Sequence, residues 1–143
     1  MSEKILLVED NPWNMKVLMM TLRPHGYTFL QATDGKEALK MAVKGKPDLV
    51  IMDIRLPKIN GLEVTRKLRQ MPALGRIPIL VVTANAMKGD KDKAIEAGCD
   101  VYLPKPIDTR QLPGVVAEML LKGRRSNTYV DGDGNGQEDS CYR

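Results

Sequence analysis

Residues 48–57 of the chain read DLVIMDIRLP, in which a continuous apolar run, 49–52, is followed directly by the carboxylate Asp53. A strand that is apolar at every position is typical of a parallel sheet covered on both faces. In open α/β sheets, ligands bind beyond the carboxyl ends of the strands. The position of Asp53 directly after this run therefore makes it the first candidate site residue.

Three other apolar runs end in a similar way. Residues 4–8 (KILLV) lead into Glu9 and Asp10, residues 79–82 (ILVV) into Thr83 and Ala84, and residues 101–103 (VYL) into Pro104, Lys105 and Pro106. The carboxyl ends of parallel strands meet at one edge of a sheet. We therefore expect three acids, one hydroxyl and one lysine to form a single site for a cation and a phosphoryl group.

The order of these runs predicts an α/β fold, because strand and helix patterns alternate five times. The expected strands are residues 4–8, 27–32, 48–53, 78–83 and 101–103. Asn11, Asp34 and Asn60 are expected to cap the first three helices, the second of which covers 35–44. The fourth helix is expected at about 87–97 before Gly98, and the fifth carries the apolar stripe from Leu112 to Leu120.

The length of 143 residues suits one domain, which we expect to span 1–122. Residues 123–143 are rich in glycine and have little to bury, so we expect a disordered tail. Within this tail, Asp131 to Gly136 resembles the start of a calcium-binding EF-hand loop. The twelfth position is Tyr142 where a bidentate glutamate is needed, which favours a flexible tail.

Composition narrows the class of protein and its location. The net charge of +4 is not clustered, and no basic stripe with interleaved aromatic residues suggests nucleic-acid binding. No apolar run approaches the roughly 18–20 residues that span a membrane, and a signal-peptide pattern is missing. Cys99 and Cys141 suggest neither a disulfide framework nor a metal site. We expect a cytoplasmic protein with no nucleic-acid or membrane partner.

Three carboxylates held close together repel one another, and this repulsion must be offset. At an effective dielectric constant near 20, each pair 4 Å apart repels by about 4 kcal/mol. Either one acid is protonated or a cation lies among them, and ligands that are all oxygens favour Mg²⁺. The cation would lower the repulsion between Asp53 and an incoming phosphoryl group, whose oxygens Lys105 and Thr83 could contact. Asp53 is then the nucleophile of a phosphoryl transfer.

The same residues carry a family resemblance. Over residues 4–122 the chain resembles the receiver domain of two-component response regulators, in Glu9-Asp10, Asp53 with Leu56-Pro57 and Gly61, Thr83-Ala84 and Lys105-Pro106. The resemblance implies a flavodoxin-like (βα)5 doubly wound parallel sheet with strand order 2-1-3-4-5. A closer similarity to single-domain regulators of the cell-division type (DivK-like) is carried by Glu9-Asp10-Asn11, Asn14-Met15-Lys16, residues 61–65 (GLEVT) and residues 86–90 (AMKGD).

The resemblance also implies a role for each site residue. Asp53 would accept phosphate from a sensor histidine kinase or a histidine phosphotransfer protein. Mg²⁺, or Mn²⁺ as a substitute, would be held by Glu9, Asp10, Asp53 and the backbone carbonyl of Arg55. The phosphoryl-binding and switch residues would be Thr83, Ala84, Tyr102 and Lys105, with a cis bond before Pro106. Tyr102 would swing inward as Thr83 moves, and change the surface of the fourth helix, fifth strand and fifth helix.

This interpretation describes a phosphoacceptor switch rather than an enzyme, although such a switch can assist its own phosphorylation and dephosphorylation. With no effector domain expected after the fifth helix, output would pass to a downstream protein target from a monomer or weak dimer. An aspartyl phosphatase or mutase is disfavoured because position 55, two residues after the nucleophile, is Arg rather than a second acid. A scaffold that never accepts phosphate stays open. Around the first helix, Trp13, Met15, Met19 and Met20 are either core or a docking face for the phosphodonor.

Overall fold

The computed structural model describes residues 3–83 and 88–122, which form a five-stranded parallel sheet with the order β2-β1-β3-β4-β5. This confirms the expected flavodoxin-like fold. The elements are β1 (Lys4–Val8), α1 (Pro12–Leu22), η1 (Arg23–His25), β2 (Thr28–Ala32), α2 (Gly35–Gly45), β3 (Leu49–Asp53), α3 (Gly61–Gln70), β4 (Ile79–Thr83), α4 (Lys88–Ala97), β5 (Val101–Pro104) and α5 (Leu112–Lys122).

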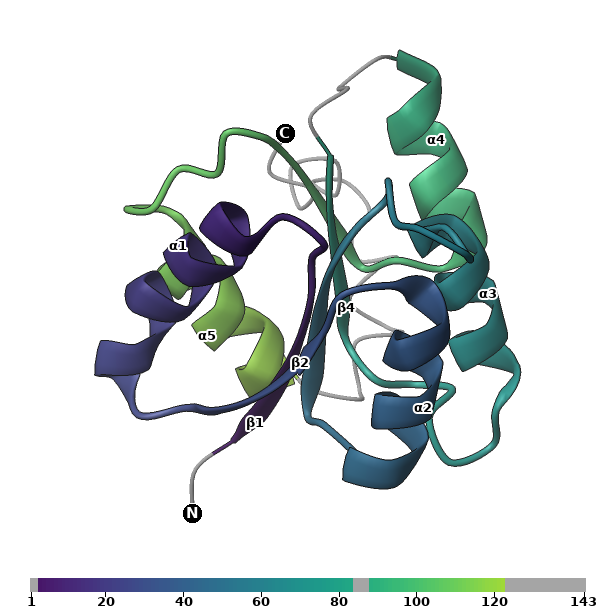
Figure 1. Ribbon diagram of the computed structural model, residues 1–143, viewed down its shortest axis with the longest axis horizontal. Helices are drawn as coiled ribbons and strands as arrows, with labels where there is room; N and C mark the ends of the chain where they lie inside the picture. The colour runs from purple at the N-terminus through teal and green to yellow at the C-terminus, as the bar shows by residue number, and fades with distance from the viewer. Residues whose placement is uncertain (1–2, 84–87, 123–143) are drawn as a thin grey trace.

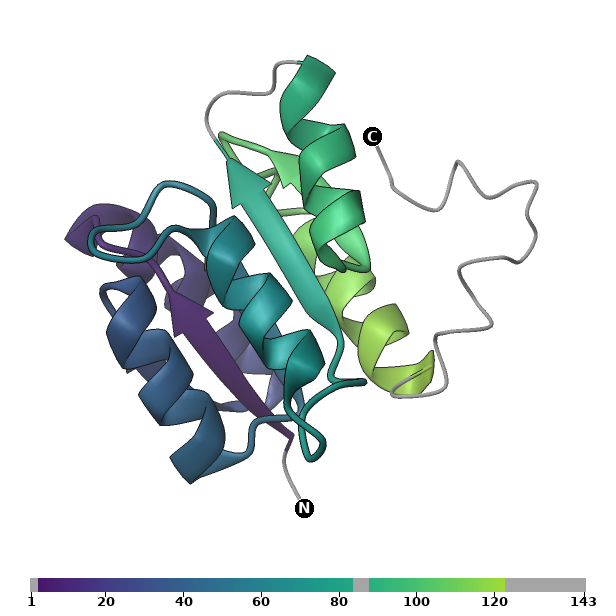
Figure 2. The same ribbon diagram turned by 90° about the vertical axis from the view of Figure 1, so that its right-hand side faces the viewer.

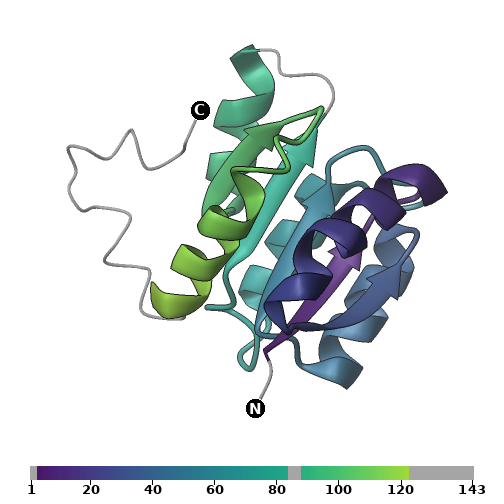
Figure 3. The ribbon, with the colours of Figure 1, turned by 90° about the vertical axis from the view of Figure 1, so that its left-hand side faces the viewer.

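Helices cover both faces of the sheet, α1 and α5 on one side and α2, α3 and α4 on the other (Figures 1, 2 and 3). The strands supply two separate core layers because successive side chains point to opposite faces. In β1, Leu6 and Val8 belong to the layer under α2, α3 and α4, while Ile5 and Leu7 belong to the layer under α1 and α5. All four are buried, which explains why the strand reads as one apolar run.

The predicted helix caps are confirmed. The Asn11 side chain accepts hydrogen bonds from the N–H groups of Trp13 and Asn14, and Asp34 and Asn60 cap α2 and α3 in the same manner. Gly98, after α4, has a φ of 114°, which L side chains rarely adopt. The three caps thus begin α1, α2 and α3 directly after the preceding strand or loop, and Gly98 lets the chain turn back toward β5 after α4.

The structure also differs from the expectation in small ways. The strands β2, β3 and β4 each begin one residue later than predicted, and β5 extends to Pro104. A short 3-10 helix, η1, follows α1 and was not predicted; it ends at Gly26, whose φ is 86°. No helix within residues 3–83 and 88–122 is long and apolar enough to cross a membrane. The expected tail, 123–143, lies outside the described residues.

At the opposite edge from the candidate site, Arg69 joins three segments. Its guanidinium donates to the carbonyl oxygens of Gly98 (2.8 Å), Gly75 (3.1 Å) and Ile77 (2.6 Å), and to the carboxylate of Asp100 (2.8 Å). The Arg69 side chain is only 21% exposed and that of Asp100 12% exposed. The planar guanidinium therefore holds the end of α3 to the loops before β4 and before β5.

The Arg69→Lys variant tests this contribution to stability. A lysine keeps the positive charge beside Asp100 but cannot reach all four acceptors, so buried carbonyl groups lose their partner. We expect the free energy of unfolding to fall by about 2 kcal/mol, measured by urea denaturation. The control is Arg66→Lys on the same helix, where an exposed pair with Glu63 predicts a change within about 0.5 kcal/mol. Equal effects of the two variants would contradict this account.

Candidate functional site

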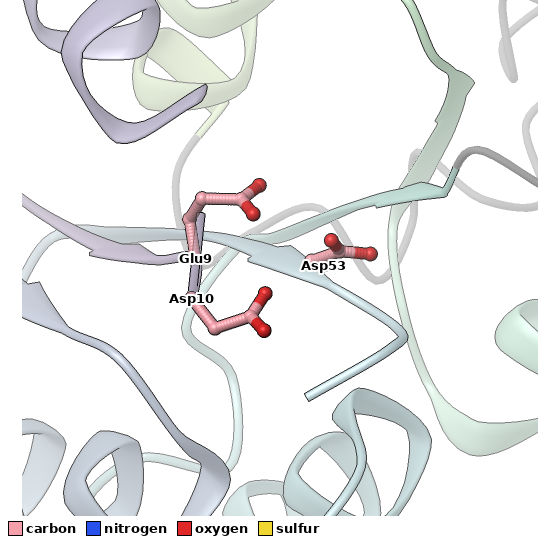
Figure 4. Close-up of side chains that lie close together, drawn as sticks. All are labelled: Glu9, Asp10 and Asp53. Atoms are coloured by element: carbon pink, nitrogen blue, oxygen red, sulfur yellow. The ribbon is translucent and has the colours of Figure 1, made fainter. Parts of the chain in front are cut away.

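The candidate site residues gather at the carboxyl edge of the sheet. Glu9 and Asp10 follow β1, Asp53 is the last residue of β3, Thr83 the last of β4, and Lys105 follows β5. Since β1, β3, β4 and β5 are consecutive neighbours in the sheet, these side chains meet although they are far apart in sequence. Figure 4 shows the carboxylates of Glu9 and Asp10 extending toward Asp53.

The three carboxylates form a compact cluster with unequal exposure. One oxygen atom from each of Glu9, Asp10 and Asp53 lies within 4.8 Å of the others. Glu9 is 1% exposed and Asp53 is 6% exposed, whereas Asp10 is exposed to solvent. The cluster therefore has a buried floor, made by Glu9 and Asp53, and an open side at Asp10.

Lys105 supplies a positive charge directly to this floor. Its Nζ atom donates hydrogen bonds to Glu9 Oε1 and to Asp53 Oδ2, both at 2.8 Å. Burial lowers the pKa of the Lys105 ammonium, but the hydrogen bonds and charges of Asp53 and Glu9 outweigh burial and raise that pKa above its ordinary value. Lys105 is therefore held in its charged form between two carboxylates.

The other oxygens of these two acids accept backbone hydrogen bonds. The Arg55 N–H donates to Asp53 Oδ1 at 3.1 Å, and the Asn11 N–H donates to Glu9 Oε2 at 3.1 Å. These contacts could not be predicted from the sequence, since backbone donors leave no signature in side-chain identity. They fix the orientation of both buried carboxylates relative to the open side of the cluster.

The donor set fits a hard divalent cation. Three carboxylates and one ammonium leave a net charge of about −2, and the ligand atoms available are oxygens that converge within a few ångströms. No histidine or cysteine belongs to the cluster, which argues against a softer transition metal. The composition and charge of the site are those that Mg²⁺ prefers.

Thr83 and Lys105 are connected through the backbone. The Lys105 N–H donates to the carbonyl oxygen of Thr83 at 2.8 Å, and Thr83 is fully buried. The peptide bond between Lys105 and Pro106 is cis, as the resemblance implies. Ala84, the remaining residue assigned to phosphoryl binding, lies outside the described residues.

Tyr102 lies on β5 inside the core layer beneath α2, α3 and α4. The side chain is 4% exposed, and its hydroxyl group has no hydrogen-bond partner among residues 3–83 and 88–122. Burial, followed by the charges of Asp90 and Cys99, raises the pKa of this phenol. The expected movement of Tyr102 with Thr83 on phosphorylation stays a prediction; in this structure its side chain is buried.

The apolar residues around the first helix, α1, were expected to be either core or an exposed docking face, and the structure shows some of each. Met15 is core and Met19 packs against the core, whereas Trp13 is 69% and Met20 60% exposed. Beside Trp13 a groove of 470 Å³ runs to Lys105, Pro106 and Ile107. The apolar stripe of α1 is therefore partly core and partly surface next to the acidic site.

Comparison with known proteins agrees with this geometry. Residues 5–117 match the family model described as the response regulator receiver domain. The polar-differentiation response regulator DivK of Brucella anthropi is 43% identical over 107 residues, which are 75% of this chain and 87% of that protein. The DivK protein of Brucella ovis has the same identity and coverage.

Solved structures show the same fold. A putative response regulator from Chloroflexus aurantiacus superposes with a TM-score of 0.82 at 34% identity, covering 85% of this chain and 99% of that one. The receiver domain of the sensor histidine kinase PA1611 from Pseudomonas aeruginosa gives a TM-score of 0.78 at 37% identity, covering 84% and 98%. That structure has a magnesium ion coordinated in its active-site cleft.

Proposed function

The chain belongs to the response regulator receiver family, and on this premise we propose that it is a DivK-like signalling switch that accepts a phosphoryl group on Asp53. The observation that carries the proposal is the double contact of Lys105 with Glu9 and Asp53 in a cluster of three carboxylates. Asp53 is the member of that cluster that is itself the last residue of a central strand, and, like Glu9, it has one oxygen on Lys105 and the other on a backbone N–H.

The proposed chemistry is a displacement at phosphorus. An oxygen of Asp53 attacks the phosphoryl group of a phosphohistidine, a P–O bond forms, and the P–N bond breaks with its electron pair left on the imidazole nitrogen. Lys105 stays in the site as an ammonium and neutralises a phosphoryl oxygen. The Arg55 N–H holds the carboxylate in place during the attack.

Glu9, Asp10, Asp53 and the backbone carbonyl of Arg55 are the proposed ligands of Mg²⁺, with Mn²⁺ as a substitute. When bound, this ion supplies positive charge that reduces the repulsion between Asp53 and the incoming phosphoryl oxygens. The support is the charge and oxygen content of the cluster, together with the magnesium ion in the Pseudomonas receiver. The open side at Asp10 gives the ion and the phosphodonor a common entrance.

The proposed output is a change in the surface formed by α4, β5 and α5. Thr83 and the backbone at Ala84 would contact the new phosphoryl group, and Tyr102 would couple this contact to the surface because it lies on β5 against the layer beneath α4. Phosphorylation then shifts the population between two arrangements by adding one charged group. The phosphodonor would be a histidine kinase or a phosphotransfer protein. The switched surface would in turn bind a downstream protein target. Because such donors act in the cytoplasm, we propose that location as well.

Labelling with a small acyl phosphate tests the proposal. We expect one phosphoryl group per chain in Mg²⁺ buffer and loss of labelling when the ion is chelated. Continuous turnover of a phosphomonoester, with no stable labelled protein, would instead support a phosphatase.

The metal site makes a separate prediction for Asp10→Asn. Asp10 is exposed and belongs to the cluster, so the variant should fold normally while the site loses one negative charge. We expect the dissociation constant for Mg²⁺ to rise about tenfold, equivalent to about 1.4 kcal/mol. The readout is the fluorescence of Trp13, the single tryptophan, because the groove beside it reaches Lys105 of the site. Asp92→Asn, an exposed acid on α4 outside the cluster, is the control and should titrate like the wild type.

A further inference from the structure

The first turn of α2 packs directly on the loop between β3 and α3, residues 54–60. Gly35, the first residue of α2, is buried, and its N–H donates to the carbonyl oxygen of Pro57 at 3.3 Å. A Cβ atom added at Gly35 would overlap the carbonyl oxygen of Ile59 and would lie 2.8 Å from the Ile59 Cβ. Two backbones can lie this close only because residue 35 has no side chain.

The same loop is connected to the acidic site by short backbone hydrogen bonds. The Ile59 N–H donates to Pro57 at 2.8 Å, and the Gly61 N–H donates to Ile54 at 2.8 Å, which closes the loop on itself. Its second residue, Arg55, donates its N–H to Asp53 Oδ1 at 3.1 Å. Any displacement of the loop away from α2 therefore moves a donor that orients the proposed phosphoacceptor.

A second contact joins the start of α2 to the loop of residues 54–60. Lys58 has a left-handed backbone, with φ at 68°, and its Nζ atom lies 3.6 Å from Asp34 Oδ2. Asp34 also caps α2, since its Oδ1 accepts the Glu37 N–H at 2.7 Å. The Glu37 N–H and the Lys58 charge lower the pKa of Asp34, so it stays ionised in this pair. The contact at Gly35 is thus flanked by an ion pair on its solvent side.

We infer that Gly35 is a positioning residue for the acidic site. Because Gly35 has no side chain, the loop of residues 54–60 can pack directly against α2. This contact holds the backbone of Arg55 where the Arg55 N–H orients Asp53 and the Arg55 carbonyl can reach a bound cation. The inference deepens the proposed function and rests on it for the identity of the cation. Some residues orient a metal ligand without binding the metal themselves. Their substitution commonly lowers metal affinity about 10–100-fold.

Gly35→Ala is the decisive variant, with Gly114→Ala as the matched control. Alanine is the better helix former at both positions, and a Cβ at Gly114, in α5, meets nothing within 4 Å. We expect Gly35→Ala to raise the dissociation constant for Mg²⁺ at least about tenfold in the Trp13 titration, and Gly114→Ala to leave it unchanged. A folded Gly35→Ala protein with the wild-type dissociation constant would overturn the inference.

Hydrogen exchange of the Arg55 amide provides a readout that needs no metal. In Gly35→Ala this amide should exchange about tenfold faster, while the Val115 amide in α5, bonded to Gln111, keeps its rate. Unchanged exchange at Arg55, or an equal increase at Val115, would point to a purely structural role and overturn the inference. If the wild type bound no Mg²⁺, the proposed function would fail, yet the exchange rate of Arg55 would still decide this inference.

Lys58→Gly covers the case in which Gly35→Ala does not fold. Glycine adopts the φ of 68° readily, so the variant should keep the fold, but it removes the ion pair with Asp34 and makes the loop backbone freer. We expect a rise in the Mg²⁺ dissociation constant of about threefold with an unchanged melting temperature. An unchanged dissociation constant here would count against positioning by this loop.

Discussion

We expect Asp53→Asn to abolish phosphate incorporation and to leave the fold intact. The carboxamide that replaces the carboxylate is a poor nucleophile. Of the other acids, Glu9 is only 1% exposed, against 6% for Asp53, so a phosphodonor reaches its carboxylate less readily. We expect incorporation from an acyl phosphate to fall more than about 100-fold, because loss of a nucleophile removes the covalent step itself.

The stability of the Asp53→Asn protein separates loss of chemistry from loss of structure. The variant removes one of three clustered negative charges, while the amide oxygen can still accept from Lys105 or from Arg55. We expect the free energy of unfolding to stay within about 1 kcal/mol of the wild type. Asp48→Asn, an exposed position just before the same strand, should keep full labelling and serves as the control. Retained labelling of Asp53→Asn at another residue would show that Asp53 is not the acceptor.

We expect Lys105→Met to lower the stability of the protein most strongly when no divalent cation is present. Methionine preserves most of the apolar stem but removes the ammonium that bonds both Glu9 and Asp53. The remaining carboxylates repel one another across less than 5 Å. We expect the free energy of unfolding to fall by about 3 kcal/mol, the usual cost of removing one partner from a buried ion pair.

Divalent cations should reverse part of this loss. A cluster without the lysine charge attracts Mg²⁺ more strongly, so millimolar Mg²⁺ should stabilise Lys105→Met more than it stabilises the wild type. Phosphoryl transfer to the variant should nevertheless be weaker, and any phosphorylated protein should switch poorly, because the proposed contact of Lys105 with a phosphoryl oxygen would be lost. Lys93→Met provides the control, since Lys93 is exposed on α4, outside the acidic cluster. Equal unfolding curves for the two variants would contradict the role of Lys105.

The same contact predicts a dependence on alkaline pH. The pKa of Lys105 is raised above its ordinary value of 10.5, so the folded state holds this proton more tightly than the unfolded state. The stabilisation is therefore complete below pH 10.5 and is lost as the pH rises through the raised pKa. Urea denaturation of the wild type and of Lys105→Met should differ by a constant amount at neutral pH and converge only in strongly alkaline solution.

The strands could be predicted because burial on both faces leaves a continuous apolar run, as in residues 49–52. The first residues of β2, β3 and β4 were each predicted one residue too early, because hydrogen-bond register decides where a strand begins. Pro78 was assigned to β4 but has no N–H to donate, and the strand begins at Ile79. Helix caps were predictable for the opposite reason, since Asn11, Asp34 and Asn60 act on the adjacent backbone within a few residues.

The members of the site could be predicted from their shared position at strand ends, but their contacts could not. Lys105 lies 96 residues from Glu9 and 52 from Asp53 in sequence, and no spacing rule connects them. The contact of Gly35 with Ile59 likewise depends on how α2 packs against the loop of residues 54–60, which lies far from it in sequence. A glycine after a helix cap carries no sequence signal that another backbone lies against it.

The chemical location of the phosphoryl group tests the central claim most directly. The wild-type protein is incubated with an acyl phosphate and Mg²⁺, and the product is reduced with borohydride, which converts an aspartyl phosphate to homoserine. Peptide mass spectrometry then identifies the converted residue. The account predicts homoserine at position 53 in Mg²⁺ buffer and unmodified Asp53 in chelator. Conversion at Glu9 or Asp10, or no conversion in a folded protein, would contradict it and favour a scaffold that never accepts phosphate.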